Sequence, residues 1–306
     1  MAEIRTRAPS HGNGCTGRDP KLLCSYDGSA IRRPILQDTR PQGGRNLMIV
    51  IIKRARRLLR EPHRLPERLS ERRMNRAALT FYAQRTFEEN AREREAFFRP
   101  FIDSQDLEGL LNEARALPTY QQILNSHSSD DPALKIAASQ TTSPDDCLTM
   151  YVMVRVWQPK VMVETGVFYG AMSAMILHAM HQNGFGRLYS IDLPIESDGL
   201  PAEIRGALVP NILRDRWKLI LGNSLQELPR LLQKLGQIDA FNHDSLHTTR
   251  HMLWEYTTVW PYLKSGGCLS SHDVLTTPAW QRFCKKHTAE ISTNGQVYGI
   301  GMALKR

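Results

Sequence analysis

From Pro144 onward the sequence alternates short apolar runs with segments of helical periodicity, and this alternation limits the fold more than any other feature. Strands are predicted at 161–165, 187–192, 217–221, 238–243 and 267–272. Helices are predicted at 145–157, 170–182, 224–235, 248–263 and 277–286. Strands and helices that alternate in this way form a parallel sheet covered on both faces. The predicted fold class is therefore α/β, with a doubly wound, mostly parallel sheet.

The end of the chain adds an antiparallel element to this sheet. Two further strands are predicted at 288–293 and 296–304, joined by Thr293-Asn294-Gly295. Asn-Gly between two apolar runs is a strong signal for a tight hairpin turn. The complete sheet is thus predicted to be seven-stranded and Rossmann-like.

A helical extension precedes the sheet. Residues 69–98 carry apolar side chains at helical spacing among many charges, which predicts one helix. A second helix is predicted over 104–116, with Asp103 or Ser104 as its N-cap. We expect residues 48–125 to form a basic segment and helical extension, and residues 140–306 to form the α/β domain.

Residues 1–47 are rich in Gly, Pro, Arg, Ser and Asp and show no periodicity, so they are predicted to be a disordered basic tail. The alternative is that the protein starts at Met48 and that residues 1–47 come from an over-long predicted start. The segment MIVIIKRARRLLR, residues 48–60, joins an apolar run to a dense basic one. It suits either a solvated tail or peripheral contact with an anionic membrane.

The net charge of +9 has an uneven distribution along the chain. Residues 1–100 contain 22 Lys and Arg against 11 Asp and Glu, whereas residues 101–306 contain 18 against 20. The nearly neutral α/β domain therefore argues against nucleic acid as a partner. Five scattered cysteines without a C-x-x-C pair suggest neither a disulfide framework nor a zinc site, and we expect a cytoplasmic protein.

The turn after the first strand predicts the ligand class. Glu164, Gly166 and Gly170 form a Glu-x-Gly-x-x-x-Gly pattern, which lacks the third glycine of a dinucleotide fingerprint and the Lys-Ser/Thr of a P-loop. A carboxylate at the start of the turn disfavours phosphate. Asp192 ends the second strand, near the spacing at which an acidic residue accepts ribose hydroxyls. A nucleoside without a pyrophosphate is the predicted ligand.

Several motifs occur in order along the chain: ETGVxxG from Glu164, LYSIDLP from Leu188, the strand 217–221 followed by Gly222-Asn223-Ser224, and DSxH from Asp244, followed by Gly266-Gly267. This series resembles the class I S-adenosylmethionine-dependent methyltransferases. Within that group it is similar to the methyltransferase domain 24 family, over about residues 140–304. The resemblance implies a methyltransferase domain with S-adenosylmethionine as cofactor.

The resemblance also implies cofactor-binding residues. Gly166 and Gly170 would let the backbone approach the methionyl part, and Glu164 would lie near its amino group. Asp192 would hold the ribose, and Asn223-Ser224 would border the adenine. There are two departures from the family pattern, because Asn223 stands where the family often has Asp and Asn242 occupies a normally apolar strand position.

Two neighbouring strand ends carry the residues suited to catalysis. Asp244 and His247 follow one strand, and His272 and Asp273 follow the next. In one interpretation His247 or His272 is the general base for an acceptor hydroxyl, with Asp244 as a catalytic partner. In another, Asp244, His272 and Asp273 bind Mg²⁺ or another divalent metal. A third is structural, with Asp244 as a helix cap and His272 as a packing residue.

We therefore expect methyl transfer, by O-methylation, to a hydroxyl of a saccharide or another small polar metabolite. One alternative is a catalytically inactive nucleoside-binding or scaffold protein that its basic segment recruits to membranes. Another is a nicotinamide-dependent oxidoreductase, against which the missing third glycine argues. The sequence predicts neither the oligomeric state nor the identity of the acceptor.

Overall fold

The structure is a computed structural model that describes residues 65–128, 142–194 and 204–306. These residues belong to one compact unit, Lys53–Arg306. The predicted disordered tail 1–47 and the basic residues 48–64 lie outside the described ranges.

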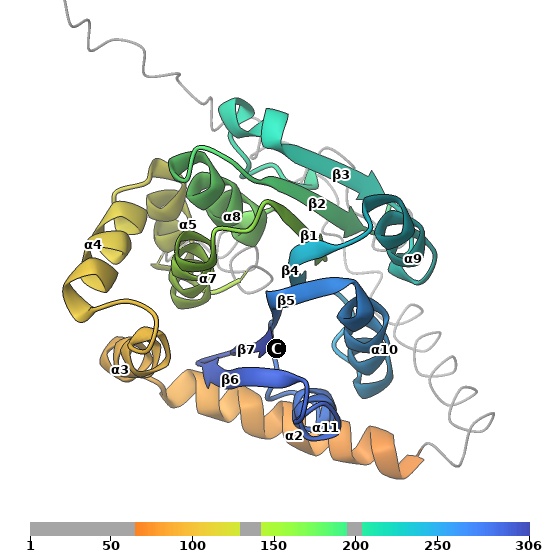
Figure 1. Cartoon of the computed structure of the whole chain (residues 1–306). Coiled ribbons are helices and arrows are strands. Elements are labelled where there is room, and N and C mark those ends of the chain that lie inside the picture. Colours follow the sequence, from red (N-terminus) through yellow and green to blue (C-terminus); the bar gives the residue numbers. More distant parts are fainter. Residues whose placement is uncertain (1–64, 129–141, 195–203) are drawn as a thin grey trace, which may run out of the picture. The chain divides into compact units, whose positions relative to one another are not determined.

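A seven-stranded sheet in the order β3-β2-β1-β4-β5-β7-β6 forms the centre of this unit (Figure 1). Its strands are β1 (Val161–Thr165), β2 (Arg187–Asp192), β3 (Trp217–Leu221), β4 (Ile238–His243), β5 (Leu263–Ser271), β6 (Ile291–Val297) and β7 (Ile300–Lys305). β1 to β5 pair in parallel, and β7 is antiparallel to both β5 and β6. The predicted fold class is confirmed, and β1 to β4 have the predicted boundaries.

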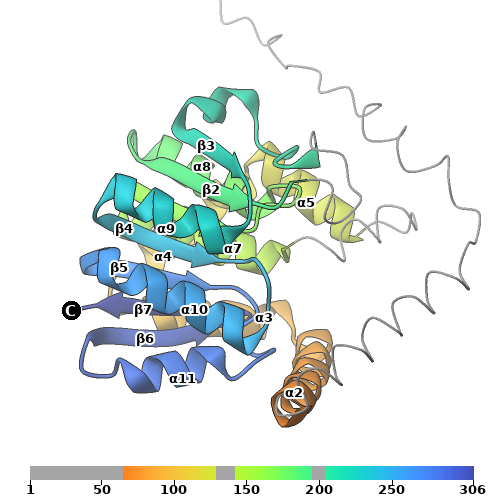
Figure 2. The ribbon, with the colours of Figure 1, turned by 90° about the vertical axis from the view of Figure 1, so that its right-hand side faces the viewer.

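Helices cover both faces of the sheet (Figures 1 and 2). α7 (Pro144–Trp157) and α8 (Ala171–Gln182) lie on one face, and α9 (Ser224–Leu235), α10 (Thr249–Val259) and α11 (Ala279–Lys286) lie on the other. Successive strand residues point to opposite faces, so Met162 of β1 joins the core under α7 and α8 whereas Val163 joins the core under α9 to α11. Burial on both faces explains the apolar run Val161-Met162-Val163 of the central strand β1.

The N-terminal helices are α2 (Leu65–Gln84), α3 (Phe87–Phe98), α4 (Ser104–Arg115) and α5 (Pro118–Ser128). Buried residues of α4 and α5 share one hydrophobic core with α7 and α8. Asp103 caps α4 as predicted, since its carboxylate accepts the N–H groups of Gln105 and Asp106, both at 2.9 Å.

The prediction of one helix over 69–98 is wrong, because the chain breaks between α2 and α3. Thr86 and Glu89 form a capping box there: the Thr86 hydroxyl accepts the Glu89 N–H at 3.2 Å, and the Glu89 carboxylate accepts the Thr86 N–H at 2.9 Å. Thr-x-x-Glu before an apolar run is a signal for a helix start, and it outweighs the continuous helical periodicity.

The turn predicted at 293–295 is also wrong. These residues lie inside β6, and the two-residue turn is Tyr298-Gly299. Gly295 serves packing instead, because a Cβ atom there would lie 2.6 Å from the Phe97 ring. Several boundaries differ as well: β5 begins at Leu263, before the predicted 267, α10 ends at Val259, before the predicted 263, and α11 begins at Ala279, after the predicted 277.

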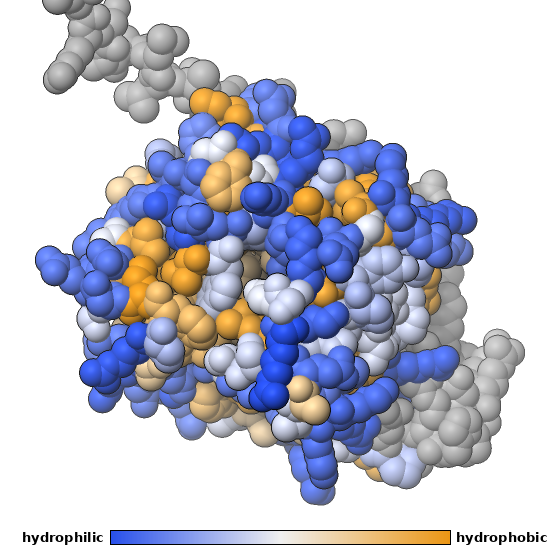
Figure 3. Space-filling model, viewed as in Figure 1, coloured by the Kyte–Doolittle hydropathy of each residue, from blue (hydrophilic) through white to orange (hydrophobic). Residues whose placement is uncertain are grey.

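None of the helices within the described ranges is both long and apolar enough to cross a bilayer. On the face that Figure 3 shows, most side chains are hydrophilic, and apolar ones gather mainly in a patch on its left side.

Candidate active site

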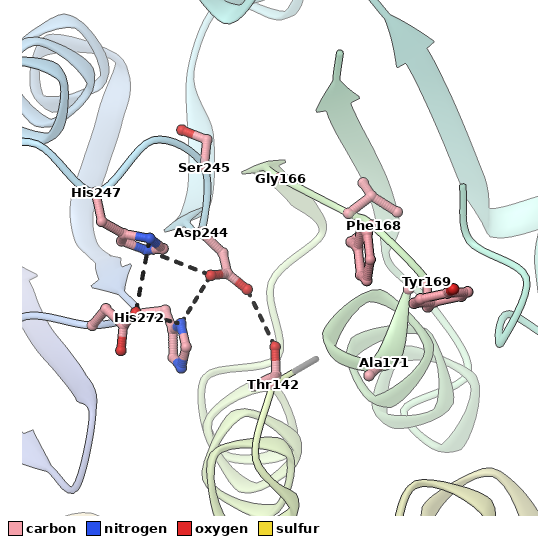
Figure 4. Close-up of a pocket in the computed structure, with 12 residues that line it drawn as sticks. Thr142, Gly166, Phe168, Tyr169, Ala171, Asp244, Ser245, His247 and His272 are labelled. Carbon is pink, nitrogen blue, oxygen red and sulfur yellow. Dashed lines mark hydrogen bonds and ion pairs between the residues drawn. The ribbon is translucent and has the colours of Figure 1, made fainter. Parts of the chain in front are cut away.

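A cavity of about 330 Å³ lies at the carboxyl ends of β1, β4 and β5 (Figure 4). Its walls come from the turn 166–171, the loop after β4 and the loop after β5. Phe168 and Tyr169 lie across the cavity from Asp244, His247 and His272. The structure thus brings the predicted glycine turn and the predicted catalytic residues to one cavity, because the carboxyl ends of parallel strands meet at the same edge of a sheet.

Both glycines of the turn are required by close packing. Gly166 and Gly170 have φ angles of 85° and 83°, which residues with a side chain rarely adopt. A Cβ atom on Gly166 would lie 1.9 Å from the backbone oxygen of Asp244, and one on Gly170 would lie 2.7 Å from the Cα atom of Gly206. The turn is therefore pressed against the loop that carries Asp244, and it fixes the distance between the two walls of the cavity.

Asp192 holds the backbone of the glycine turn by hydrogen bonds. Its carboxylate accepts the backbone N–H groups of Val167 at 3.2 Å and Phe168 at 2.8 Å. The same oxygen lies 3.3 Å from the Nε atom of Arg205. Asp192 is not among the residues that line the cavity, and its carboxylate holds the backbone of the turn that does.

Glu164 is fully buried beneath the cavity. Its Oε1 atom accepts hydrogen bonds from the hydroxyls of Ser173 at 2.5 Å and Ser190 at 2.6 Å. Its Oε2 atom is buried and has no partner among the residues that the structure describes. Burial raises the pKa of this carboxyl from 4.5 to about 7, although the two serine hydroxyls act in the opposite direction.

We expect the Glu164 carboxyl to make the protein less stable as pH rises. Its pKa is higher in the folded state, so its contribution is fully present below pH 4.5 and is lost as pH rises through about 7. Between pH 5 and pH 8 the free energy of unfolding of the wild type should fall by about 2–3 kcal/mol more than that of Glu164→Gln. Urea unfolding at both pH values measures the difference. Glu108→Gln, at an exposed carboxylate, is the control, and equal slopes for wild type and Glu164→Gln would contradict the assignment.

Asn223 and Ser224 lie outside the cavity. Asn223 is exposed and caps α9, because its Oδ1 atom accepts the Leu225 N–H at 2.9 Å. The Ser224 hydroxyl lies 3.2 Å from the Nε2 atom of His251. Asn242 is fully buried and accepts the Ser270 hydroxyl at 2.9 Å. Asn223 and Asn242, which depart from the family pattern, therefore have structural roles in this fold.

Asp244 is the centre of the polar wall of the cavity (Figure 4). Its Oδ1 atom lies 2.9 Å from the Nδ1 atom of His272 and 3.6 Å from the Nε2 atom of His247. Its other oxygen accepts the Thr142 hydroxyl at 3.3 Å. The Oδ2 atom of Asp273 lies 3.8 Å from the Nδ1 atom of His247. All four predicted residues of the two strand ends thus meet.

The surroundings of the two histidines shift their pKa values in opposite directions. Both ring nitrogens of His272 face carboxylates, since Nε2 lies 3.3 Å from Asp146. Burial alone would lower the pKa of His272, but Asp244, Asp273 and Asp146 raise it well above its usual value. Burial and then His243 lower the pKa of His247 to about 4. At neutral pH His272 is therefore an imidazolium ion and His247 is a neutral imidazole.

The predicted metal ligands fit magnesium poorly. The side chains whose ligand atoms gather within 4.8 Å of one another are Asp244, His247 and His272, with His247 in the place predicted for Asp273. Magnesium prefers an all-oxygen set. Both nitrogens of His272 lie within hydrogen-bond distance of a carboxylate, and its raised pKa favours the protonated ring, from which a metal would have to displace a proton. The positive charge at this wall is therefore assigned to the His272 imidazolium.

Two groups at the site were not predicted from the sequence. Asp146, in the first turn of α7, bonds His272 and accepts the Ser143 hydroxyl at 2.6 Å. Glu255 of α10 is fully buried and accepts hydrogen bonds from the Thr165 hydroxyl at 2.5 Å and the Ser245 hydroxyl at 3.0 Å. The His243 Nδ1 atom lies 2.6 Å from the same carboxylate. A glutamate on the apolar face of a predicted helix was the available signal for Glu255.

Residues 163–274 match the model of a family described as a methyltransferase domain. The matched segment runs from within β1 to just beyond β5, so it contains the glycine turn, Asp192, Asp244 and both histidines of the cavity. The predicted resemblance to class I methyltransferases is confirmed for this segment. A search of the curated proteins gave no match.

Solved structures show a partial likeness. An SAH-bound methyltransferase of Podospora anserina, PaMTH1, is similar over 67% of this chain and 97% of its own, with 13% identity and a TM-score of 0.49. The O-methyltransferase TomG of Streptomyces achromogenes, in complex with SAM, is similar over 67% and 99%, with 14% identity and a TM-score of 0.47. An O-methyltransferase of Bacillus cereus in complex with SAH is similar over 65% and 100%, with 13% identity and a TM-score of 0.46.

Proposed function

Residues 163–274 carry a methyltransferase domain on a seven-stranded sheet, and from this premise we propose that the protein transfers a methyl group from S-adenosylmethionine to a hydroxyl group. The observation that supports it best is the common cavity of the glycine turn and the Asp244, His247 and His272 side chains. The acceptor that we propose is a saccharide or another small polar metabolite, the class that the family resemblance implies.

The cavity fits a cofactor with a cationic and a hydroxyl-rich part. One wall is the backbone of 166–170, and the opposite wall carries the carboxylates of Asp244 and Asp273. Glu164 leaves one oxygen atom without a partner within the described part of the chain, directly behind the turn. We propose that Gly166 and Gly170 border the methionyl part, that Glu164 influences its amino group, that Asp192 positions the turn toward the ribose, and that Asn223-Ser224 lie on the adenine side.

In the proposed mechanism His247 accepts the proton of the acceptor hydroxyl. Its ring is neutral at neutral pH and lines the cavity, and its Nε2 atom is buried and has no hydrogen-bond partner in the described ranges. Asp244 and Asp273, on either side of the ring, stabilise the positive charge that develops as the proton arrives. The chemistry that the cofactor supplies is an electrophilic methyl group, and the two facing walls hold the acceptor oxygen in line with it.

His272 has a different role in this mechanism. Because it is held as a cation between Asp244 and Asp146, it cannot accept a further proton. It offsets the charge of the Asp244 carboxylate and fixes its orientation toward His247. Of the two candidate bases from the sequence, the geometry therefore favours His247.

Calorimetric titration of the full chain tests the proposed cofactor. S-adenosylmethionine and S-adenosylhomocysteine should bind with micromolar affinity, and NAD should not bind. A chelator should leave binding and turnover unchanged. If neither adenosyl ligand binds to the folded protein, the proposal fails and the inactive scaffold alternative is favoured.

Asp192→Ala should weaken cofactor binding by at least about tenfold. The substitution removes the acceptor for two backbone N–H groups of the turn, and each hydrogen bond to a charged group contributes about 1.5–3 kcal/mol. Asp192→Asn keeps an acceptor oxygen and should lie between Asp192→Ala and the wild type. The dissociation constant of S-adenosylhomocysteine is the measurement, and an unchanged value in Asp192→Ala would exclude Asp192 from the cofactor site.

A further inference from the structure

The helix α2 lies near the candidate active site, beyond the carboxyl ends of the parallel strands (Figure 2). Near the start of α2 the Glu71 Oε1 atom accepts the backbone N–H of Thr249 at 2.8 Å, which satisfies a donor at the N-terminus of α10. Near its end the Tyr82 ring packs on Tyr298, with ring centroids 4.9 Å apart. Most of α2 is otherwise exposed, and Ala78 is its buried apolar residue in the described part of the helix.

Tyr82 reaches the polar cluster of the site, where the Asp273 carboxylate lies within reach of its hydroxyl. Its hydroxyl is buried and has no hydrogen-bond partner of good geometry among the described residues. A side chain on Gly299 would meet the Tyr82 hydroxyl oxygen at 3.4 Å and the Asp146 carboxylate at 3.5 Å, so both groups face one small space. Burial and then Asp273 and Asp146 raise the pKa of Tyr82, so the hydroxyl stays protonated. An unpartnered buried donor is costly unless a ligand completes it.

An apolar groove adjoins this hydroxyl. Its volume is about 560 Å³, which is within the range of small-molecule sites. The apolar residues that line it are Met74, Ala77, Ala78, Phe81 and Leu275. The groove also includes Glu93, but one carboxylate oxygen of Glu93 pairs with Arg85 at 2.7 Å and the other accepts the Tyr298 N–H at 3.0 Å. The charge of Glu93 is thus offset, and the groove suits an uncharged apolar group.

One short loop contributes residues to the linings of both the groove and the cavity. Asp273 lines the cavity, and Leu275, two residues later, lines the groove. On the opposite side Phe81 and Ala78 line the groove, while Tyr82, the next residue of α2, faces Asp146 and Gly299. Tyr82 therefore lies at the boundary between the polar site and the apolar groove.

We propose that the methyl acceptor is a molecule with a hydroxyl-bearing head and an apolar arm, that the arm lies in the groove between α2 and Leu275, and that the Tyr82 hydroxyl contacts the head. This inference rests on the proposed function and narrows its acceptor class, because a bare saccharide would leave the groove empty. Tyr82 is a positioning residue in this arrangement, and His247 remains the proton acceptor.

The test compares methyl and hexyl β-D-glucoside, which share a head and differ only in the arm. Each is titrated into the full chain saturated with S-adenosylhomocysteine, below the concentration at which the hexyl compound forms micelles. Each methylene removed from water contributes about fourfold in affinity, so partial burial of the arm should make the hexyl compound bind at least about tenfold more tightly. Ala77→Phe, which fills the groove, should abolish this preference. Leu79→Phe, on the exposed side of the same helix, should retain it.

Tyr82→Phe separates the head contact from the arm contact. It should weaken both glucosides about equally, leave the hexyl preference unchanged, and leave the midpoint of urea unfolding unchanged or higher, because it removes an unpartnered buried hydroxyl. A lowered midpoint with unchanged glucoside affinity would assign Tyr82 to packing alone and overturn its part in the proposal.

Equal affinity for the two glucosides in the wild type would overturn the arm site, as would a hexyl preference that survives in Ala77→Phe. The failure of the cofactor proposal is a separate result. In that case S-adenosylhomocysteine would not bind, while the comparison of the glucosides could still be made without it.

Discussion

Replacement of Gly166 by alanine should remove cofactor binding and lower the free energy of unfolding by on the order of 3–5 kcal/mol. The added Cβ atom would lie 1.9 Å from the backbone oxygen of Asp244, and backbone atoms cannot move away as a flexible side chain can. The turn or the loop after β4 would have to shift, which changes the width of the cavity that both of them line. Urea unfolding and calorimetry with S-adenosylhomocysteine measure the two effects.

Gly184→Ala is the matched control for this prediction. Gly184 has a φ angle of 78°, close to the 85° of Gly166, but a Cβ atom there would have no other atom within 4 Å. It should therefore cost only the strain of a left-handed residue, about 1–2 kcal/mol, and leave the cofactor affinity unchanged. Equal destabilisation by the two substitutions would show that backbone conformation, and not the contact with Asp244, explains the glycine at 166.

Replacement of His247 by alanine should lower the rate of methyl transfer by about 10²–10⁴-fold, the usual contribution of a general base. The affinity for S-adenosylmethionine should change less than about threefold, because the ring lies across the cavity from Phe168 and Tyr169 and the glycine turn is left intact. Single-turnover kinetics with an identified acceptor, together with calorimetry, separate the two quantities. A rate within a factor of about three of the wild type would remove His247 from the proton-transfer step.

His181→Ala controls for the loss of an imidazole. His181 lies in the last turn of α8 and is exposed, away from the cavity lining, so both the rate and the cofactor affinity should equal those of the wild type. If both histidine variants lose activity to the same degree, the loss in His247→Ala reflects general destabilisation and carries no information on the base.

The arrangement at Asp244 explains why one histidine suits catalysis and its neighbour does not. His272 has a carboxylate at each nitrogen and is held as a cation. His247 is near the same Asp244 oxygen at a longer distance and beside the buried His243 ring, whose centroid is 5.3 Å from its own. Different neighbours thus leave one of two adjacent imidazoles charged and the other neutral at neutral pH.

The sequence alone predicted the elements of the sheet because their pattern is local. A buried parallel strand is an apolar run, and a following helix shows its own periodicity, so β1 to β4 could be placed with their observed boundaries. The carboxyl ends of such strands converge on one edge, and for this reason Gly166, Asp244, His247 and His272 could be expected at one site. The error at Thr86 arose because a capping box competes there with the helical periodicity, and both are local signals. The error at 293–295 arose because Gly295 packs on the distant Phe97 ring.

Only the tertiary structure decided how these residues are used. Gly295 reads as a turn residue until the Phe97 ring is seen to pack on it, and only the structure shows that Asp192, a predicted ribose ligand, also bonds the glycine turn. The charge state of His272 depends on Asp146, which is 126 positions away in the chain. Sequence spacing reports which residues are suited to a reaction, whereas protonation, accessibility and acceptor shape depend on contacts between distant segments that form only on folding.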